Sequence, residues 1–226
     1  MSLARRVAAE FGGALILAAV VIGSGVMGVR LADGNAAIAL LANTLATAAI
    51  LFVLITALAP VSGAHFNPAV TLVFTLKREL AWGDAIAFVI AQIVGCVTGG
   101  LLAHALFELP LLRTATNVRE GLSQWLSEGA ATFALVACIL LVSRARPNAV
   151  AAAVALTIAA GYWWTASTSF ANPAITIARA FSDTFAGIRP EDAPGFIVAQ
   201  FVGALIAFAT CAWLVPGGAA KRNSGG

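Results

Sequence analysis

Two similar polar interruptions in an otherwise apolar sequence carry the residues that could do chemistry. They are Asn67-Pro68-Ala69, within the stretch 63–71, and Asn172-Pro173-Ala174, within 169–176. Each reads as the start of a helix, because asparagine is a favoured N-cap residue and proline fits the first helical position. An asparagine there can cap the helix with its amide oxygen and offer its NH2 group to a polar molecule. The duplication favours this double role over the alternative that both side chains are caps alone.

The composition indicates where these two helix starts lie. Hydrophobic residues make up 61% of the 226 residues and charged residues only 10%, whereas soluble domains carry about 25% charged residues. We therefore expect an all-α polytopic membrane protein. The basic residues do not form the cluster that a nucleic-acid-binding surface requires. Cys96, Cys138 and Cys211 each lie within an apolar run, which predicts buried thiols and no disulfide framework.

The lengths of the apolar runs predict the elements that position the two boxes. About 20 apolar residues cross the hydrocarbon core of a bilayer. On this criterion the sequence predicts six spans, near residues 7–29, 36–59, 84–107, 122–143, 149–166 and 194–215. The apolar stretches after Asn67 and Asn172 are about ten residues long, which is half a span. Each short helix must therefore enter and leave the membrane on one side, with its N-terminus at mid-membrane.

The distribution of basic residues predicts that both termini are cytoplasmic. In that orientation the cytoplasmic segments hold Arg5, Arg6, Lys77, Arg78, Arg144, Arg146, Lys221 and Arg222. The opposite side holds fewer, namely Arg30, Arg113, Arg119, Arg179 and Arg189. Since cytoplasmic loops carry the excess of Lys and Arg, we expect the first short helix to enter from the cytoplasm and the second from outside.

The two boxes belong to an internal repeat. A glutamate opens the first and fourth spans, at Glu10 and Glu128, and the pattern Ala-Gln-x-Val-Gly recurs around Gln92 and Gln200. The repeat halves are about 7–107 and 122–215. Each half contains three spans, so the halves must be inverted relative to each other. Inverted repeats with interrupted helices at mid-membrane are typical of a substrate pathway.

Glu10 and Glu128 are the only acids predicted deep within spans. A buried acid in a membrane is a functional hypothesis by default. We favour a structural role, in which each carboxylate accepts hydrogen bonds from the backbone of a re-entrant loop, over the alternative of a proton relay. Gln92 and Gln200 are expected to serve helix or loop packing.

Paired Asn-Pro-Ala boxes, one in each half of a six-span chain, resemble the signature of the aquaporin (major intrinsic protein) family, and the resemblance covers about residues 7–215. It implies a single channel domain over 1–226, with six transmembrane helices and two re-entrant half-helices. The implied activity is passive passage of water and small neutral solutes across a lipid bilayer, in a plasma or bacterial inner membrane. The family's usual assembly implies a homotetramer with one pore per protomer and no cofactor.

The resemblance also assigns roles to individual residues. Glu10 and Glu128 are implied to support the loops, as inferred above from their burial. His65 resembles the family's histidine beside the lumen on the cytoplasmic side. A metal site is not expected there, because one histidine is too few ligands and His104 is predicted far away.

The selectivity filter is where this chain departs from the family. Typical members have Arg directly after the second box, where this chain has Ile175. By spacing, the other filter positions fall at Thr47, at Ala160 (with Gly161 as the alternative) and at Ser169. Such a ring is wide, lacks a fixed cation and should pass solutes larger than water. The departure looks like a bacterial subgroup associated with arsenic resistance, which implies metalloid hydroxides such as arsenite, or methylated arsenicals, as solutes.

Arg179 follows Ile175 by four residues, on the same helical face. Two interpretations remain open. Its long side chain either leans back toward the helix N-terminus as a cation at the outer mouth or pairs with Asp183 four residues later.

Two rival functions differ from a passive channel. A secondary transporter can be built on the same inverted halves, and a structural membrane protein would have a closed pore. An enzyme is least expected, because Glu10, Glu128 and His65 form no evident acid–base constellation.

Overall fold

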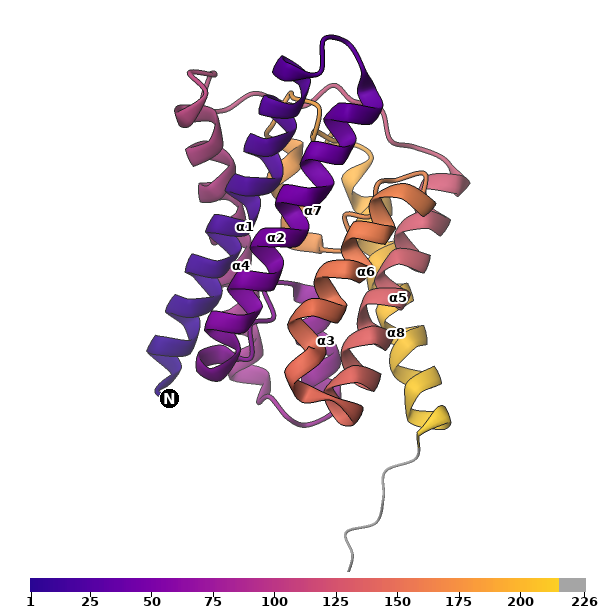
Figure 1. Ribbon diagram of the computed structural model, residues 1–226. Coiled ribbons are helices and arrows are strands. Elements are labelled where there is room, and N and C mark those ends of the chain that lie inside the picture. Colours follow the sequence, from indigo (N-terminus) through magenta and orange to yellow (C-terminus); the bar gives the residue numbers. More distant parts are fainter. Residues whose placement is uncertain (216–226) are drawn as a thin grey trace, which may run out of the picture.

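The computed structural model describes residues 1–215, and the regular elements of this part of the chain are helices (Figure 1). They are α1 (Leu3–Leu31), α2 (Ala36–Ser62), α3 (Pro68–Leu76), α4 (Trp82–Leu106), α5 (Leu122–Ala145), the 3₁₀ turn η1 (Pro147–Ala149), α6 (Val150–Trp164), α7 (Pro173–Ala180) and α8 (Ala193–Leu214). The all-α expectation is confirmed. Lys221 and Arg222, counted above as cytoplasmic, lie outside the described residues.

All six predicted spans correspond to helices. Five of them, α1, α2, α4, α5 and α8, are long and apolar enough to cross a membrane. The sixth, α6, has 15 residues, which is about 22 Å of helix and shorter than the predicted 149–166. It ends at Trp164 because Thr165 turns to an extended conformation, and the chain then leads back toward the box at Asn172.

The six long helices pack as two matching groups of three. Helix α1 lies against α2 and α4, and α5 lies against α6 and α8. Glycines permit the closest approaches: a Cβ at Gly95 would lie 2.5 Å from the Phe11 carbonyl oxygen of α1, and one at Gly203 would overlap the Gly129 carbonyl oxygen of α5. Small residues at such interfaces let membrane helices pack backbone to backbone.

The half-helices α3 and α7 lie between these two groups and approach each other. Helix α3 contacts α4 and α8, α7 likewise contacts α4 and α8, and the two half-helices contact one another. In Figure 1, α3 lies in the lower half of the molecule and α7 in the upper half. The predicted arrangement of two half-helices, each capped by its Asn-Pro pair, is confirmed.

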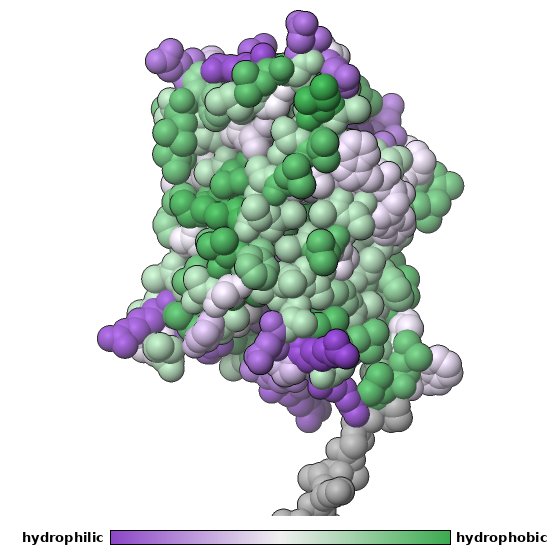
Figure 2. Space-filling view, in the orientation of Figure 1, coloured by the Kyte–Doolittle hydropathy of each residue, from purple (hydrophilic) through white to green (hydrophobic). Residues whose placement is uncertain are grey.

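The surface is that of an integral membrane protein. Figure 2 shows a broad apolar and neutral band with hydrophilic residues gathered at the two ends. Five exposed tryptophans lie near helix ends: Trp82 opens α4, Trp125 is in the first turn of α5, Trp163 and Trp164 end α6, and Trp213 is near the end of α8. Tryptophan is enriched at the two membrane–water interfaces, so these residues mark the edges of the apolar band.

Candidate functional site

A cavity of about 450 Å³ runs between the two groups of helices and past both boxes. Its walls include Pro147 and Asn148 at one end and Arg179 at the other, with Asn67 and Asn172 between them. Most of the remaining lining is apolar: Leu17, Val21, Leu51, Ile55, Val70, Leu135, Ile139, Val154, Ile158 and Ile175. The cavity is therefore a mainly apolar passage, and its polar side chains come both from the re-entrant segments, such as Asn67 and Asn172, and from the long helices, such as Thr47 and Tyr162.

The two asparagines meet across the centre of this cavity. The Oδ1 atom of Asn67 accepts a hydrogen bond from the Ala69 backbone N–H at 2.9 Å, and Oδ1 of Asn172 accepts from Ala174 at 2.9 Å and from Ile175 at 3.3 Å. Each NH2 group donates across the interface, from Asn67 to the Ala171 carbonyl (2.7 Å) and from Asn172 to the Phe66 carbonyl (2.8 Å).

An amide NH2 group has two hydrogens, and the cross-interface bond uses one of them. One N–H of each asparagine therefore remains for a molecule in the cavity. The two half-helix N-termini, which carry partial positive charge, face the same point. This arrangement favours hydrogen-bond acceptors and opposes cations.

The segments leading into the boxes have a strained backbone. Non-glycine residues with positive φ occur before both boxes: Ala64 and Phe66 before the first, and Thr168, Ser169 and Ala171 before the second. The left-handed conformation costs such residues about 1–2 kcal/mol each. The surrounding structure must therefore hold these segments in place.

Glu10 holds the first segment. It is fully buried and accepts from Ser62 Oγ (2.6 Å), from the His65 and Phe66 backbone N–H groups (3.0 and 2.7 Å), and from Gln92 Nε2 (2.8 Å). Four donors satisfy the carboxylate. These contacts support the loop-supporting role expected from the sequence over a proton relay.

Glu128 makes the matching set of contacts in the second half. It accepts from Ser167 Oγ (2.5 Å), from the Phe170 and Ala171 backbone N–H groups (2.9 and 2.8 Å), and from Gln200 Nε2 (2.6 Å). Because the same types of donor recur around both acids, the internal repeat extends from sequence to hydrogen bonding.

Gln92 and Gln200 connect these acids to the half-helices. The Nε2 group of Gln92 also donates to Thr71 Oγ1 of α3, and that of Gln200 to Thr176 Oγ1 of α7, both at 2.9 Å. Both glutamines are fully buried. They therefore join the loop support to the half-helix itself, which is more specific than the packing role expected for them.

His65 lies on the cavity wall on the same side of the boxes as Pro147 and Asn148. Its ring stacks on Phe74 (centroids 4.7 Å apart) and meets Phe88 edge-on at 5.7 Å, and Nδ1 lies 3.2 Å from Thr71 Oγ1. Within the described residues, no group of three His, Cys, Asp or Glu side chains could hold a metal ion.

Three of the four expected filter residues line the cavity. Thr47, Ser169 and Ile175 are buried wall residues, but Ala160 is exposed on the outside of α6. The cavity face of α6 carries Val150, Val154, Ile158 and Tyr162, one every four residues, as helical periodicity requires. The expectation that Ala160 lines the filter is therefore wrong, and Tyr162 is the residue of α6 that lies beside Thr47 on the cavity wall.

The alternative residue, Gly161, also lies off the cavity wall. A Cβ there would lie 2.5 Å from Ser169 Oγ, so this glycine makes room for Ser169. The Tyr162 hydroxyl lies 3.1 Å from Thr47 Oγ1 of the adjoining helix α2. The ring is therefore narrower on the α6 side than a Thr, Ala, Ser, Ile set.

Arg179 lies at the end of the cavity opposite His65. It is only 2% exposed, donates from Nε to the Ala186 carbonyl, and stacks over the ring of Phe170 with its guanidinium carbon 3.2 Å from the ring centroid. The alternative ion pair does not form, because Asp183 pairs with Arg113 at 2.9 Å. Within the described part of the chain, the terminal nitrogens of Arg179 have no protein acceptor.

Sequence reasoning missed Tyr162 and Phe170. Tyr162 is the single tyrosine of the chain, and its spacing of four from Ile158 and eight from Val154 would have indicated a shared face. Phe170 gave no comparable signal, because its role depends on Arg179 lying over it.

Comparison with known proteins agrees with this geometry. A model of the family "Major intrinsic protein" matches residues 1–150. The chain is 54% identical over 213 residues to the aquaglyceroporin AqpS of Rhizobium meliloti (strain 1021), covering 94% of this chain and 91% of that relative. It is 36% identical over 105 residues to the probable aquaporin PIP2-8 of Oryza sativa subsp. japonica, which is 46% of this chain and 37% of that protein.

The fold has a match among solved structures. The X-ray structure of the aquaglyceroporin from Plasmodium falciparum aligns with a TM-score of 0.73 at 20% sequence identity, over 92% of this chain and 95% of the other. This likeness concerns the fold. Since the family model covers more than half of the chain and AqpS matches nearly all of it, this chain belongs to the major intrinsic protein (aquaporin) family.

Proposed function

We propose that this protein is a passive membrane channel for water and small uncharged solutes of about glycerol size. The observation that carries the proposal is the cavity itself, an apolar passage with the NH2 groups of Asn67 and Asn172 at its centre. A hydroxylated solute can accept hydrogen bonds from these donors while its carbon side faces the apolar wall. The relative AqpS, which is named an aquaglyceroporin, supports the same solute class.

The solute range follows from the ring of Thr47, Tyr162, Ser169 and Ile175. The aliphatic Ile175 replaces the arginine expected there and leaves the ring without a fixed charge. The cation of the outer mouth is instead Arg179, one helical turn farther out. We include metalloid hydroxides such as arsenite, and methylated arsenicals, among the candidate solutes, because a ring with an apolar wall accepts solutes with methyl groups.

A passive mechanism fits the buried acids. Glu10 and Glu128 each accept four hydrogen bonds from protein donors. A transporter coupled to protons needs a membrane acid that exchanges partners, and these two acids are bonded to the loops they support and to a glutamine of a neighbouring helix. We therefore favour a channel over a secondary transporter, a closed-pore structural protein and an enzyme.

Stopped-flow measurements on proteoliposomes test this function. The purified chain is expected to raise the permeability of the vesicles to water, glycerol, urea and arsenite, with flux proportional to the gradient. Empty vesicles and vesicles with the Asn67→Ala, Asn172→Ala double variant are the controls. Accumulation against a gradient would favour a transporter, and unchanged permeability for every solute would favour a closed pore.

The assembly and orientation are also proposals. We propose a single channel domain over 1–226 with inverted halves near 7–107 and 122–215, assembled as a homotetramer with a pore in each protomer. We also propose that the protein lies in the cell membrane, which in a bacterium is the inner membrane, with both termini cytoplasmic. Native mass spectrometry in detergent tests the tetramer, and protease access to an N-terminal tag in intact cells tests the orientation.

A further inference from the structure

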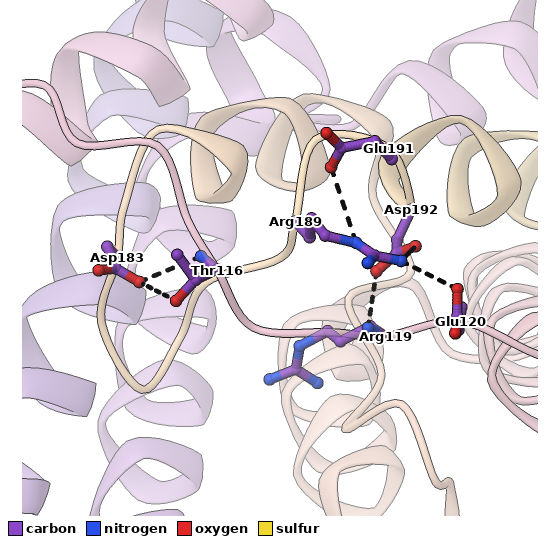
Figure 3. A network of polar contacts seen from close by, with 7 residues as sticks. All are labelled: Thr116, Arg119, Glu120, Asp183, Arg189, Glu191 and Asp192. Carbon is purple, nitrogen blue, oxygen red and sulfur yellow. Dashed lines mark hydrogen bonds and ion pairs between the residues drawn. The ribbon is translucent and has the colours of Figure 1, made fainter.

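The segment between α4 and α5, residues 107–121, crosses the molecule beside the outer mouth and carries a half-buried arginine, Arg119. Figure 3 shows that the Arg119 backbone N–H bonds to the Asp192 carboxylate at 2.8 Å, while the guanidinium points away from the neighbouring Glu120 and Glu191. Arg119 is not on the cavity wall. Its side chain must therefore act on something other than a solute.

The Arg119 guanidinium ties together the two limbs of the second re-entrant segment. Its Nε donates to the Gly187 carbonyl at 2.8 Å, and one terminal nitrogen donates to the Ser167 carbonyl at 3.1 Å. Ser167 is on the limb that leads into the box, and Gly187 is on the limb that leads out of α7. A planar fork of donors suits this bridge between two carbonyls, whereas the point charge of lysine does not.

Arg119 also contacts residues next to those that hold Arg179. The guanidinium carbon of Arg119 lies 5.0 Å from the centroid of the Phe170 ring, and that of Arg179 lies 3.2 Å from the same centroid. The Nε group of Arg179 donates to the carbonyl of Ala186, the residue before the Gly187 that Arg119 bonds. Both contacts that hold Arg179 against the wall are therefore adjacent to contacts made by Arg119.

We propose that Arg119 is a positioning residue for selectivity, which fixes Phe170 and Ala186 and thereby keeps Arg179 against the wall of the outer mouth. The proposal rests on the proposed channel function. Arg179 has a long side chain with several rotatable bonds, and its terminal nitrogens have no protein acceptor within the described residues. Without its support, the side chain swings into the passage, which obstructs a glycerol-sized solute more than water.

Arg113 provides a matched control in the same segment. It is exposed, pairs with Asp183, and bonds through its backbone to Phe181. Arg113 carries the same charge as Arg119, but it bonds to neither Phe170 nor Ala186, the two residues that hold Arg179. If loss of charge or of loop stability lowers the ratio of glycerol to water permeability, substitution of either arginine should do so. If positioning of Arg179 is the cause, only substitution of Arg119 should.

The test is the ratio of glycerol to water permeability in proteoliposomes. Arg119→Gln and Arg119→Lys are both expected to lower this ratio at least about threefold, whereas Arg113→Gln leaves it within about 1.5-fold, in keeping with coupling between contacting residues only. In the Arg179→Gln background, Arg119→Gln should change the ratio no further, because the side chain it positions is gone. Thermal unfolding of each variant shows whether it is folded.

Two results would overturn the proposal. One is an unchanged ratio in a folded Arg119 variant, and the other is a full effect of Arg119→Gln in the Arg179→Gln background. If neither Arg119 variant folds, Phe170→Leu removes the ring that links the two arginines and must lower the ratio in the same way; an unchanged ratio there refutes the link. Glycerol flux through the unmodified channel tests the channel function separately.

Discussion

Replacing Ile175 by arginine restores the residue type that the family usually places after the second box. Ile175 is a cavity-wall residue, and its ring neighbours are Thr47, Tyr162 and Ser169. The guanidinium would enter a ring that Tyr162 already narrows. We therefore expect Ile175→Arg to lower glycerol and arsenite permeability at least about tenfold, equivalent to about 1.4 kcal/mol of barrier, while water permeability changes less than about threefold.

The same substitution places two cations on one helical face. Arg179 is four residues farther along α7, a rise of about 6 Å. Two unit charges at that distance and an effective dielectric constant of about 20 repel by about 3 kcal/mol. Ile175→Arg should therefore lower the stability of the protein, and the added Arg179→Ala substitution should recover part of the loss without restoring glycerol flux.

Stopped-flow light scattering on proteoliposomes measures both permeabilities in one preparation. Ile175→Leu is the matched control, because it conserves the volume and polarity of the side chain and should leave both values nearly unchanged. If a folded Ile175→Arg protein keeps its glycerol flux, then Ile175 does not line the constriction and the assignment of the ring is wrong.

Three further predictions concern the supports of the pore. Asn172→Ala should reduce flux and should cost more stability than Asn67→Ala, because Asn172 accepts two capping bonds and Asn67 accepts one. The cap of Asn67 is worth about 0.5–2 kcal/mol. Urea unfolding compares the two variants, and equal losses of stability would refute the ranking. Glu128→Gln replaces a carboxylate that accepts four hydrogen bonds by an amide whose own N–H faces those donors. We therefore expect about 2–4 kcal/mol of destabilisation, with solute flux retained in the folded fraction. Loss of a proton-coupled flux from a stable variant would instead indicate a proton relay. In the loop after α7, hydrogen bonds from the Thr116 side chain and backbone, with the Arg113 charge, lower the pKa of Asp183. The ionised carboxylate thus stabilises the fold above its unfolded pKa of about 3.9, and this contribution is lost as the pH falls through the lower folded value. Thermal unfolding between pH 3 and 6 should therefore depend on pH less in Asp183→Asn, and identical slopes would contradict the assignment.

Much of the architecture could be predicted from local properties of the sequence. The long helices follow from runs of about 20 apolar residues. The half-helices follow from an Asn cap, a Pro at the first position and the return of charge within about ten residues. The position of Glu10 and Glu128 deep within spans also predicted that they support the loops, because a buried carboxylate must find donors.

Spacing failed where the path of the backbone is irregular. Thr47 and Ser169 were placed on the cavity wall by counting from the boxes, but the same counting placed Ala160 there instead of Tyr162. Helix α6 ends at Trp164, and the irregular segment 165–171 that follows has a direction that its own residues do not specify. The helical face that meets the cavity could be identified only once that segment was in place.

The sequence by itself determined that this chain crosses a membrane as inverted halves with two interrupted helices, because run length, capping and repetition are properties of neighbouring residues. Only the tertiary structure decided which side chains line the cavity beside Ile175 and what Arg179 contacts. Asp183 is close to Arg179 in sequence, yet it bonds to Arg113 and Thr116 of a distant segment. Arg179 packs on Phe170 instead, because contacts between separate segments depend on where packing brings them, and sequence distance does not encode it.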